Sequence, residues 1–280
     1  MNTFELTGLL FIGSLLAGFL GSLTGLGGGV VIVPLLTLAF GVDIRYAIGA
    51  SLVSVIATSS GAAAAYVREG FSNIRVGMFL EIATTIGAIA GAVTAAYLKL
   101  SWIAIVFGLV LLSSAYEAVK SHTDLPGPSH PDRIAARLRM DGTFPTSQGM
   151  QSYRVTNVPA GFGVMFTAGV LSGVLGIGSG AVKVLAMDRA MKLPFKVSTT
   201  TSNFMIGVTA AASAGVYLNR GYIDPGLAMP VMLGVLGGSL TGARFLAGAQ
   251  VRVLRIVFSI VVALLGLEMM YNGFVGKFVQ

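Results

Sequence analysis

The chain has 280 residues, of which 55% are hydrophobic and only 10% are charged. Soluble domains carry about 25% charged residues, so this composition excludes an ordinary soluble fold and indicates a polytopic membrane protein. The absence of cysteine excludes disulfides and thiolate metal sites. The net charge of +7 does not point to nucleic acid as a partner, because basic residues that flank membrane spans account for it.

Apolar segments predict a chain made almost entirely of helices, because lipid offers no hydrogen-bond partners to an open backbone. Most of these segments reach the roughly 20 residues that a helix needs to cross a bilayer. The N-terminal segment 1–10 contains no Lys or Arg, so the first span is expected to remain rather than to be removed as a secretory signal. In chain order the predicted segments are 8–41, 46–66, 73–97, 102–119, 157–193, 198–218, 226–247 and 252–272.

The first segment, 8–41, is too long for a single crossing. As one continuous helix it would measure about 51 Å, whereas the hydrocarbon core of a bilayer is roughly 30 Å thick. The glycine cluster GLGGG at 25–29 interrupts it. We expect the chain to turn at this cluster and to return to the same side as a short helix that begins near Val30. Such a hairpin is either re-entrant or crosses the membrane twice.

The chain contains an internal repeat with an offset of 151 residues. At this offset the cluster at 25–29 superposes on GIGSG at 176–180, and Ser51 superposes on Ser202. A second hairpin is therefore expected, with a short helix that begins near Ala181. Paired glycine-broken segments in two halves of a membrane protein are typical of transporter binding sites.

Basic residues indicate how the two halves lie in the membrane. With a hairpin in each half, thirteen Lys and Arg residues fall on one side and four on the other, whereas single crossings give nine against eight; Lys183, inside a span, is not counted. The positive-inside rule favours the hairpins, with both termini extracytoplasmic. Each half then crosses an odd number of times, so the second half is inverted relative to the first. The four minority residues are Arg45, Lys99, Arg220 and Lys277.

The predicted fold is an all-α polytopic membrane protein of two inverted repeats, each a broken helical hairpin followed by three transmembrane helices. The repeats are residues 1–120 and 157–280, and residues 121–156 form a cytoplasmic loop between them. Four prolines break regular structure within this loop. Within it, the sequence leaves open a short basic helix over Arg133–Met140 or a hairpin that turns at Asp141-Gly142. The loop is either a solvated linker or a surface that binds a partner or anionic lipid.

The two glycine clusters are candidate anion sites. Each cluster precedes a short helix, whose free N–H groups and dipole can bind an anion without a buried cation. The alternative is that these glycines only allow helices to pack closely, which is the interpretation we favour for Gly87, Gly91, Gly238 and Gly242. The candidate substrate-binding residues in the clusters are Gly27, Gly28, Gly29, Val30, Gly178, Ser179 and Gly180.

Polar side chains within the spans extend this candidate site. Hydroxyl and amide groups at Ser51, Ser202 and Asn203 can coordinate an anion, although hydroxyls in membrane helices often bond back to their own helix. Lys183 lies in the first turn of the second short helix and is a candidate anion ligand; the alternatives are snorkelling or pairing with Asp188.

Two carboxylates in the spans are candidates for coupling transport to an ion gradient. Glu81 is the stronger candidate, as a protonatable group, against a structural role as a partner of Arg75 or Arg244. Asp188 is the second candidate. A proton or cation is the coupling ion that such carboxylates would bind.

These glycine clusters and their spacing resemble the TauE/SafE family, also called the sulfite exporter or toluene sulfonate uptake permease family. The stretch GLGGGVVIVP at 25–34 matches the first glycine-rich motif, and 176–180 matches its second copy. The polar stretch STTTSN at 198–203 is similar to the segment that follows in the second half. One departure is Leu185, at the position where the first copy has Pro34. The resemblance implies a transporter of sulfur-containing anions such as sulfite, thiosulfate or organosulfonates.

The sequence thus predicts a secondary transporter of a small anion in a membrane of the bacterial inner-membrane type, with no cofactor and no metal. A passive anion channel is the alternative, since it would share the helix-dipole site. An enzyme is disfavoured because the spans contain no histidine, no cysteine and no G-x-S-x-G or H-E-x-x-H motif. The lipid bilayer and the anion are the expected partners.

Overall fold

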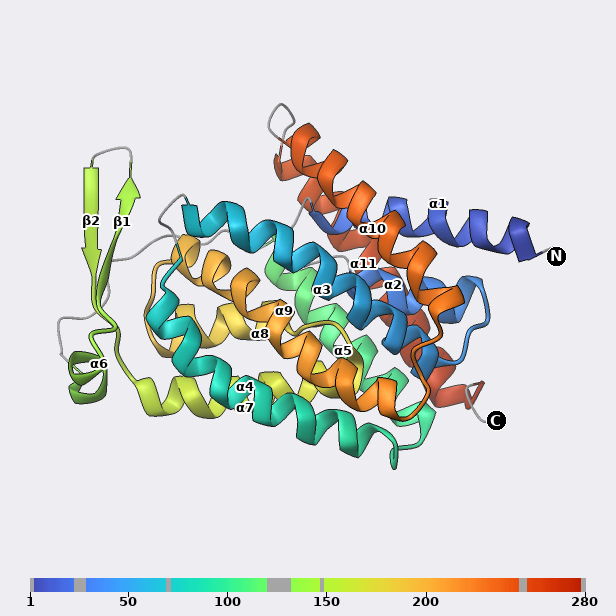
Figure 1. Ribbon diagram of the computed structural model, residues 1–280, viewed down its shortest axis with the longest axis horizontal. Coiled ribbons are helices and arrows are strands. Elements are labelled where there is room, and N and C mark those ends of the chain that lie inside the picture. Colours follow the sequence, from blue (N-terminus) through green and yellow to red (C-terminus); the bar gives the residue numbers. More distant parts are fainter. Residues whose placement is uncertain are drawn as a thin grey trace.

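The computed structural model describes residues 3–22, 29–68, 72–119, 132–146, 149–246 and 251–277. Most of this chain is helical, in a bundle with a small β-hairpin at one end (Figure 1). The helices of the first half are α1 (Thr3–Ser22), α2 (Gly29–Pro34), α3 (Ile44–Arg68), α4 (Ile74–Ala95) and α5 (Leu100–Val119). Those of the second half are α7 (Val158–Leu175), α8 (Gly180–Leu185), α9 (Phe195–Asn219), α10 (Pro225–Leu246) and α11 (Val251–Val275).

Five helices in the described part of the chain are long and apolar enough to cross a membrane. They lie in α4, α5, α7, α10 and α11, which confirms that this is a polytopic helical protein. The central helices α3 and α9 are the most polar of the long helices, and they pack against each other along their length. Most of the hydroxyl-bearing side chains described in these two helices are buried within the bundle, whereas Thr58 and Thr199 are half-buried.

The two halves correspond element by element at the offset of 151 residues. Thus α3 corresponds to α9 and α4 to α10, with identical bounds after the shift. Short π-helical segments follow α2 and α8 at Leu35–Ala39 and Ala186–Ala190, again at the same offset. The halves interlock: α1 packs against α10, and its counterpart α7 packs against α4. The core therefore forms between the halves as well as within each of them.

Glycines allow these helices to approach with their backbones nearly in contact. A Cβ atom on Gly91 would lie 2.2 Å from the carbonyl oxygen of Val170, and one on Gly238 would lie 2.0 Å from that of Leu15. No larger residue fits at such distances. Gly87 meets α7 in the same way, which confirms the packing interpretation for these three glycines.

The repeat-related helices α5 and α11 pack antiparallel. The hydroxyl of Ser259 donates to the carbonyl oxygen of Ala115 over 2.7 Å, near the end of α5 and the start of α11. At the other end, a Cβ on Gly273 would lie 3.0 Å from the carbonyl oxygen of Ser101. Two like helices related by a two-fold axis are antiparallel only when that axis is perpendicular to them.

The central segment differs from the expected loop. It contains both a short helix, α6 (Arg133–Arg137), and a β-hairpin of β1 (Gly142–Thr146) and β2 (Gly149–Tyr153). The predicted turn at Asp141-Gly142 is wrong: Gly142 pairs with Tyr153 at the open end of the hairpin, and Thr146 pairs with Gly149 beside the turn. The reason is that a carboxylate oxygen of Asp141 accepts from the N–H of Val155 over 2.8 Å, which closes the open end.

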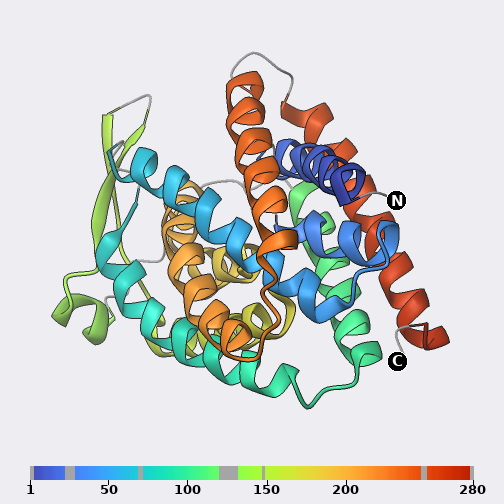
Figure 2. The same cartoon turned by 45° about the vertical axis from the view of Figure 1, so that its right-hand side comes forward.

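The described part of this segment also packs on the bundle rather than forming a solvated linker. Met140, Phe144 and Tyr153 are buried in a second core cluster with residues of α4 and α9. Asn73 caps α4 and donates from Nδ2 to the carbonyl of Met140 and to the Tyr153 hydroxyl, each over 2.8 Å. Burial raises the pKa of the Tyr153 phenol. In Figures 1 and 2 the hairpin lies at the end of the bundle opposite the start of α1 and the end of α11.

Candidate functional site

The second glycine cluster breaks the hairpin helix as predicted. Helix α7 ends at Leu175 and α8 begins at Gly180, with the intervening residues buried. Gly176, Gly178 and Ser179 have φ angles of 69°, 71° and 48°, a left-handed conformation that reverses the chain. A Cβ on Gly178 would also lie 2.6 Å from the side chain of Ile206. This position therefore needs glycine both for its backbone conformation and for its close contact with α9.

The first cluster lies largely outside the described residues, and with it the predicted ligands Gly27 and Gly28. Gly29 opens α2, and Val30 follows in the first turn, both buried. A Cβ on Gly29 would lie 2.6 Å from a methyl group of Val55 and 2.9 Å from the hydroxyl of Ser51. The start of α2 is thus packed tightly against α3, as the start of α8 is against α9.

Ser51 contacts the backbone of both glycine clusters. Its hydroxyl donates to the carbonyl oxygen of Gly176 over 2.9 Å and lies 3.3 Å from that of Gly29. In the other half, the hydroxyl of Ser202 donates to the carbonyl of Gly180 over 3.3 Å, at the position equivalent to the Ser51–Gly29 contact. Both serines therefore fix the backbone of the breaks. Asn203, the next residue of α9, is half-buried.

Ser179 carries a buried hydroxyl for which the described residues provide no hydrogen-bond partner. It is 2% exposed and precedes the first residue of α8. Burial of an unpaired hydroxyl costs free energy, so such groups in native proteins usually have a functional or structural reason. Since the N–H of Lys183 donates to the carbonyl of Ser179, the two residues span the first turn of α8.

Lys183 is fully buried, and its partner is not the one considered from the sequence. Its Nζ donates to the hydroxyl of Thr209 on α9, and that hydroxyl donates to Oε1 of Glu81 on α4 over 2.7 Å. A threonine hydroxyl has one proton and two lone pairs, so it can accept from the ammonium while donating to the carboxylate. The hydroxyl of Thr85 also donates to Oε1 over 3.3 Å. Oε2 of Glu81 is buried without a partner in the described residues.

The contacts of Glu81 and Lys183 thus differ from the ion pairs that the sequence left open for these two residues. Arg75 donates to the carbonyl of Arg139 in the central segment rather than to Glu81. Asp188 is half-buried in the π-helical segment beyond α8, and the adjacent Arg189 pairs with Glu117 over 3.1 Å. The side chain of Arg244 lies outside the described part of the chain.

Sequence reasoning missed Thr209, although a signal for it existed. Thr209 follows Ser202 by seven residues, or about two helical turns, so the two side chains share a face of α9. The repeat comparison would also have drawn attention to it. Its counterpart Thr58 keeps the hydroxyl, whereas the positions equivalent to Lys183 and Glu81 are Ile32 and Met232. The two charged groups therefore come one from each half, and neither has a charged counterpart in the other half.

These features agree with the comparison to known proteins. The family described as sulfite exporter TauE/SafE matches residues 10–269. The chain belongs to the sulfite exporter TauE/SafE family. The matched residues include both glycine clusters and all five apolar spans except the last few residues of α11. The family assignment therefore covers the candidate site as well as the fold.

Relatives of this TauE/SafE protein occur in bacteria and archaea. The "Probable membrane transporter protein YunE" of Bacillus subtilis is 26% identical over 272 residues, which cover 95% of this chain and 97% of the relative. The "Probable membrane transporter protein MJ0441" of Methanocaldococcus jannaschii is 26% identical over 276 residues, or 94% of each chain. A "Probable membrane transporter protein" of Xylella fastidiosa is 25% identical over 92% of each chain. No solved structure matches the chain.

Proposed function

We propose that this TauE/SafE protein is a secondary transporter that moves a small anion, a sulfur-containing oxyanion or organosulfonate such as sulfite or thiosulfate, by alternating access. The observation that carries this proposal is the fully buried Lys183 one turn from the Ser179 hydroxyl, which has no partner among the residues that the structure describes, at a glycine break. A buried cation and a buried hydroxyl donor are groups that an anion can use. The family description supports the choice of a sulfur anion.

The anion would bind where the two breaks meet. Gly178, Ser179 and Gly180 form the second break and Lys183 follows it, so the hydroxyl, the ammonium and the free N–H groups of the first turn can all donate. From the first break, Gly27, Gly28, Gly29 and Val30 would face the same site. The contact from Ser51 to the carbonyl of Gly176 supports this convergence, since it joins α3 of one half to the break of the other.

Glu81 is the proposed coupling group, with Asp188 as the second candidate. Lys183, Thr209 and Glu81 form a buried set in which the cation and the carboxylate balance. An anion that binds Lys183 would leave this set with a net negative charge, and a charge within the membrane is costly. A proton on Glu81 restores neutrality for a singly charged anion such as an organosulfonate, and removes one of the two excess charges of a dianion such as thiosulfate. The anion and at least one proton would therefore move together, in the same direction.

We further propose that residues 1–120 and 157–280 are inverted repeats, with both termini extracytoplasmic and residues 121–156 cytoplasmic in a membrane of the bacterial inner-membrane type. The antiparallel packing of α5 against α11 supports a two-fold axis in the membrane plane. The position of the β-hairpin at the end opposite the start of α1 and the end of α11 supports the location of the central segment (Figure 2).

The experiment is uptake of thiosulfate, sulfite and methanesulfonate into proteoliposomes with and without an imposed pH gradient. The proposal predicts accumulation of an anion against its gradient when the proton gradient drives it, and loss of this accumulation in Glu81→Gln. A passive channel would let the anion equilibrate but never accumulate. The complete burial of Lys183 favours the transporter, because a continuously open pore would expose its ligands. Transport of none of these anions would refute the proposed substrate class.

A further inference from the structure

The short helix α6 leaves two apolar side chains uncovered. Ile134 is 39% exposed, and Leu138, the residue that ends the helix, is 42% exposed. They lie four residues apart, so they share one face of this turn. Another side of the same turn packs on the protein, because Ala135 and Met140 are buried in the second core cluster. The helix is therefore fixed to the bundle on one side and presents an apolar pair on another.

Asp132 holds α6 at the point where α7 begins. One carboxylate oxygen accepts from the N–H of Ile134 in α6, and the other accepts from the N–H of Val158, the first residue of α7, each over 2.8 Å. From Val158 onward, α7 is one of the apolar spans. The polar headgroup layer of a bilayer begins where such a span ends. The contacts of Asp132 thus place α6 at the level of the lipid headgroups, at the hairpin end of the bundle (Figure 1).

Two arginines accompany the apolar pair. Arg133 directly precedes Ile134, Arg137 directly precedes Leu138, and both arginine side chains are exposed. Neither forms an ion pair with the residues that the structure describes. The two carboxylates of the described central segment, those of Asp132 and Asp141, accept from backbone N–H groups instead. The uncovered face of α6 therefore combines apolar side chains with positive charge.

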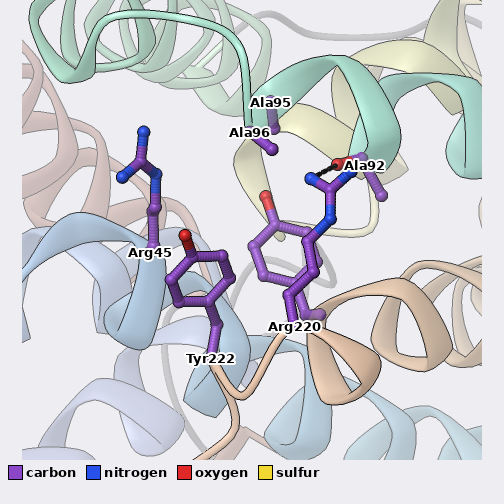
Figure 3. Close-up of a pocket in the computed structure, with 7 residues that line it drawn as sticks. Arg45, Ala92, Ala95, Ala96, Arg220 and Tyr222 are labelled. Carbon is purple, nitrogen blue, oxygen red and sulfur yellow. Dashed lines mark hydrogen bonds between the residues drawn. The ribbon is translucent and has the colours of Figure 1, made fainter.

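The arginines at the other end of the bundle are held by the protein itself. Arg45 stacks on Tyr222, with Cζ 5.7 Å from the ring centroid. Arg220 stacks on Tyr97 and donates to the carbonyl of Ala92 over 3.4 Å (Figure 3). No described residue holds the guanidinium groups of α6 in this way. The N–H donors of these two groups are consequently available to a ligand outside the chain.

We propose that the face of α6 formed by Arg133, Ile134, Arg137 and Leu138 docks on the anionic lipid leaflet beside α7. The two apolar side chains insert at the level of the headgroups, and the guanidinium groups bind lipid phosphates. Each arginine close to an anionic surface favours docking about fivefold. The docked helix anchors the central segment to the membrane. This docking requires only that α7 spans the bilayer and does not depend on the proposed transport function.

The test is tryptophan fluorescence of the full chain in nanodiscs that contain phosphatidylglycerol brominated near its headgroup. Trp102, the single tryptophan of the chain, is replaced by phenylalanine, and Leu138→Trp then places the probe on the docking face. Its emission should be strongly quenched, because bromine quenches only at short range. The control Thr143→Trp, at an exposed position of β1, should remain unquenched.

The same probe tests the role of charge. Arg133→Gln combined with Arg137→Gln should lower the ratio of quenched to unquenched protein about 25-fold, as measured by fluorescence lifetimes. The matched control, Lys99→Gln combined with Lys277→Gln, removes the same charge from exposed positions at the opposite end of the bundle and should leave this ratio unchanged. High salt should act like the arginine changes, because it screens exposed charges.

Four results overturn the inference. They are an unquenched probe in Leu138→Trp, equal quenching in Thr143→Trp, equal effects of the arginine and lysine changes, and equal quenching by brominated phosphatidylcholine in nanodiscs without anionic lipid. The first result would assign this face of α6 to a soluble partner, and the last would remove the recognition of charge. Because the measurement involves no transport, failure of the proposed function would leave the docking site standing.

Discussion

Replacement of Lys183 by methionine is the sharpest test of the central site. The change leaves the carboxylate of Glu81 buried and without its cation, since Glu81 is only 9% exposed and its links to Lys183 run through Thr209. Removal of one partner from a buried pair costs about 3–5 kcal/mol. We therefore expect Lys183→Met to lower the free energy of unfolding by about this amount. Glu81→Gln alone should also destabilise the protein, because it leaves the ammonium buried without a carboxylate.

The double variant Lys183→Met with Glu81→Gln removes both charges and should recover stability to within about 1 kcal/mol of the original. The assay is reversible unfolding in mixed micelles with increasing SDS, read by far-UV circular dichroism. Losses that simply add in the double variant would refute the pairing, because groups in contact show non-additive effects.

Threonine variants give a matched control from the internal repeat. Thr209→Val removes the hydroxyl that joins Lys183 to Glu81 and should cost about 1–3 kcal/mol, the penalty for leaving buried polar partners unsatisfied. Thr58→Val changes the equivalent residue of the other half, where the hydroxyl donates to the carbonyl of Ser54 in its own helix over 3.0 Å. That loss should stay below about 1 kcal/mol. Equal losses would show that Thr209 is an ordinary helix hydroxyl.

The same variants separate an anion ligand from a structural cation. If Lys183 binds the anion, both Lys183→Met and the double variant should lose affinity by about 1.5–3 kcal/mol, or roughly 10- to 150-fold. Isothermal calorimetry with thiosulfate measures this loss. A double variant with restored stability and unchanged affinity would exclude the ligand role while leaving the buried pair intact.

Three further predictions concern the break, the central segment and the topology. Gly178→Ala should lower the free energy of unfolding by about 2–4 kcal/mol in thermal unfolding, because Gly178 has a φ of 71° and lies against Ile206. The control Gly163→Ala, at a position on α7 with open space around it, should be neutral or stabilising. Similar effects of the two changes would show that the break has no special requirement for glycine. The N–H groups of Val158 and Ile134 donate to the Asp132 carboxylate and hold its pKa below the usual value. The stability that these hydrogen bonds contribute is therefore fully present above about pH 4 and is lost as the pH falls through the lower pKa of the folded state. Proteolysis of the central segment should therefore increase in acid, and Asp132→Asn should remove that pH dependence. The chain has no cysteine, so a single cysteine can be placed at the exposed Thr143 of β1. This cysteine should not react with impermeant thiol reagents added outside sealed cells. Rapid labelling would contradict the proposed orientation.

Local patterns in the sequence were sufficient for the helical architecture and for the second break. The apolar segments leave few alternatives to helices in a bilayer. The cluster at 176–180 breaks a helix because two of its glycines adopt the left-handed conformation, and glycine is the residue that does so at little cost. Turn chemistry was less reliable. Asp141-Gly142 has the composition of a tight turn, yet the side chain of Asp141 closes the open end of the hairpin through Val155.

The sequence by itself determined the membrane class, the duplicated helices and the break at 176–180, because these depend on composition, spacing and local backbone conformation. Only the tertiary structure decided the partner of Lys183. Asp188 lies five residues away, but five residues place two side chains on different faces of a helix. Glu81 is more than a hundred residues distant in the chain and comes within reach because α4 and α8 both pack against α9. Arg45 and Arg220, from different halves, line the same pocket for the same reason: the two halves pack against each other, and no local pattern encodes such contacts.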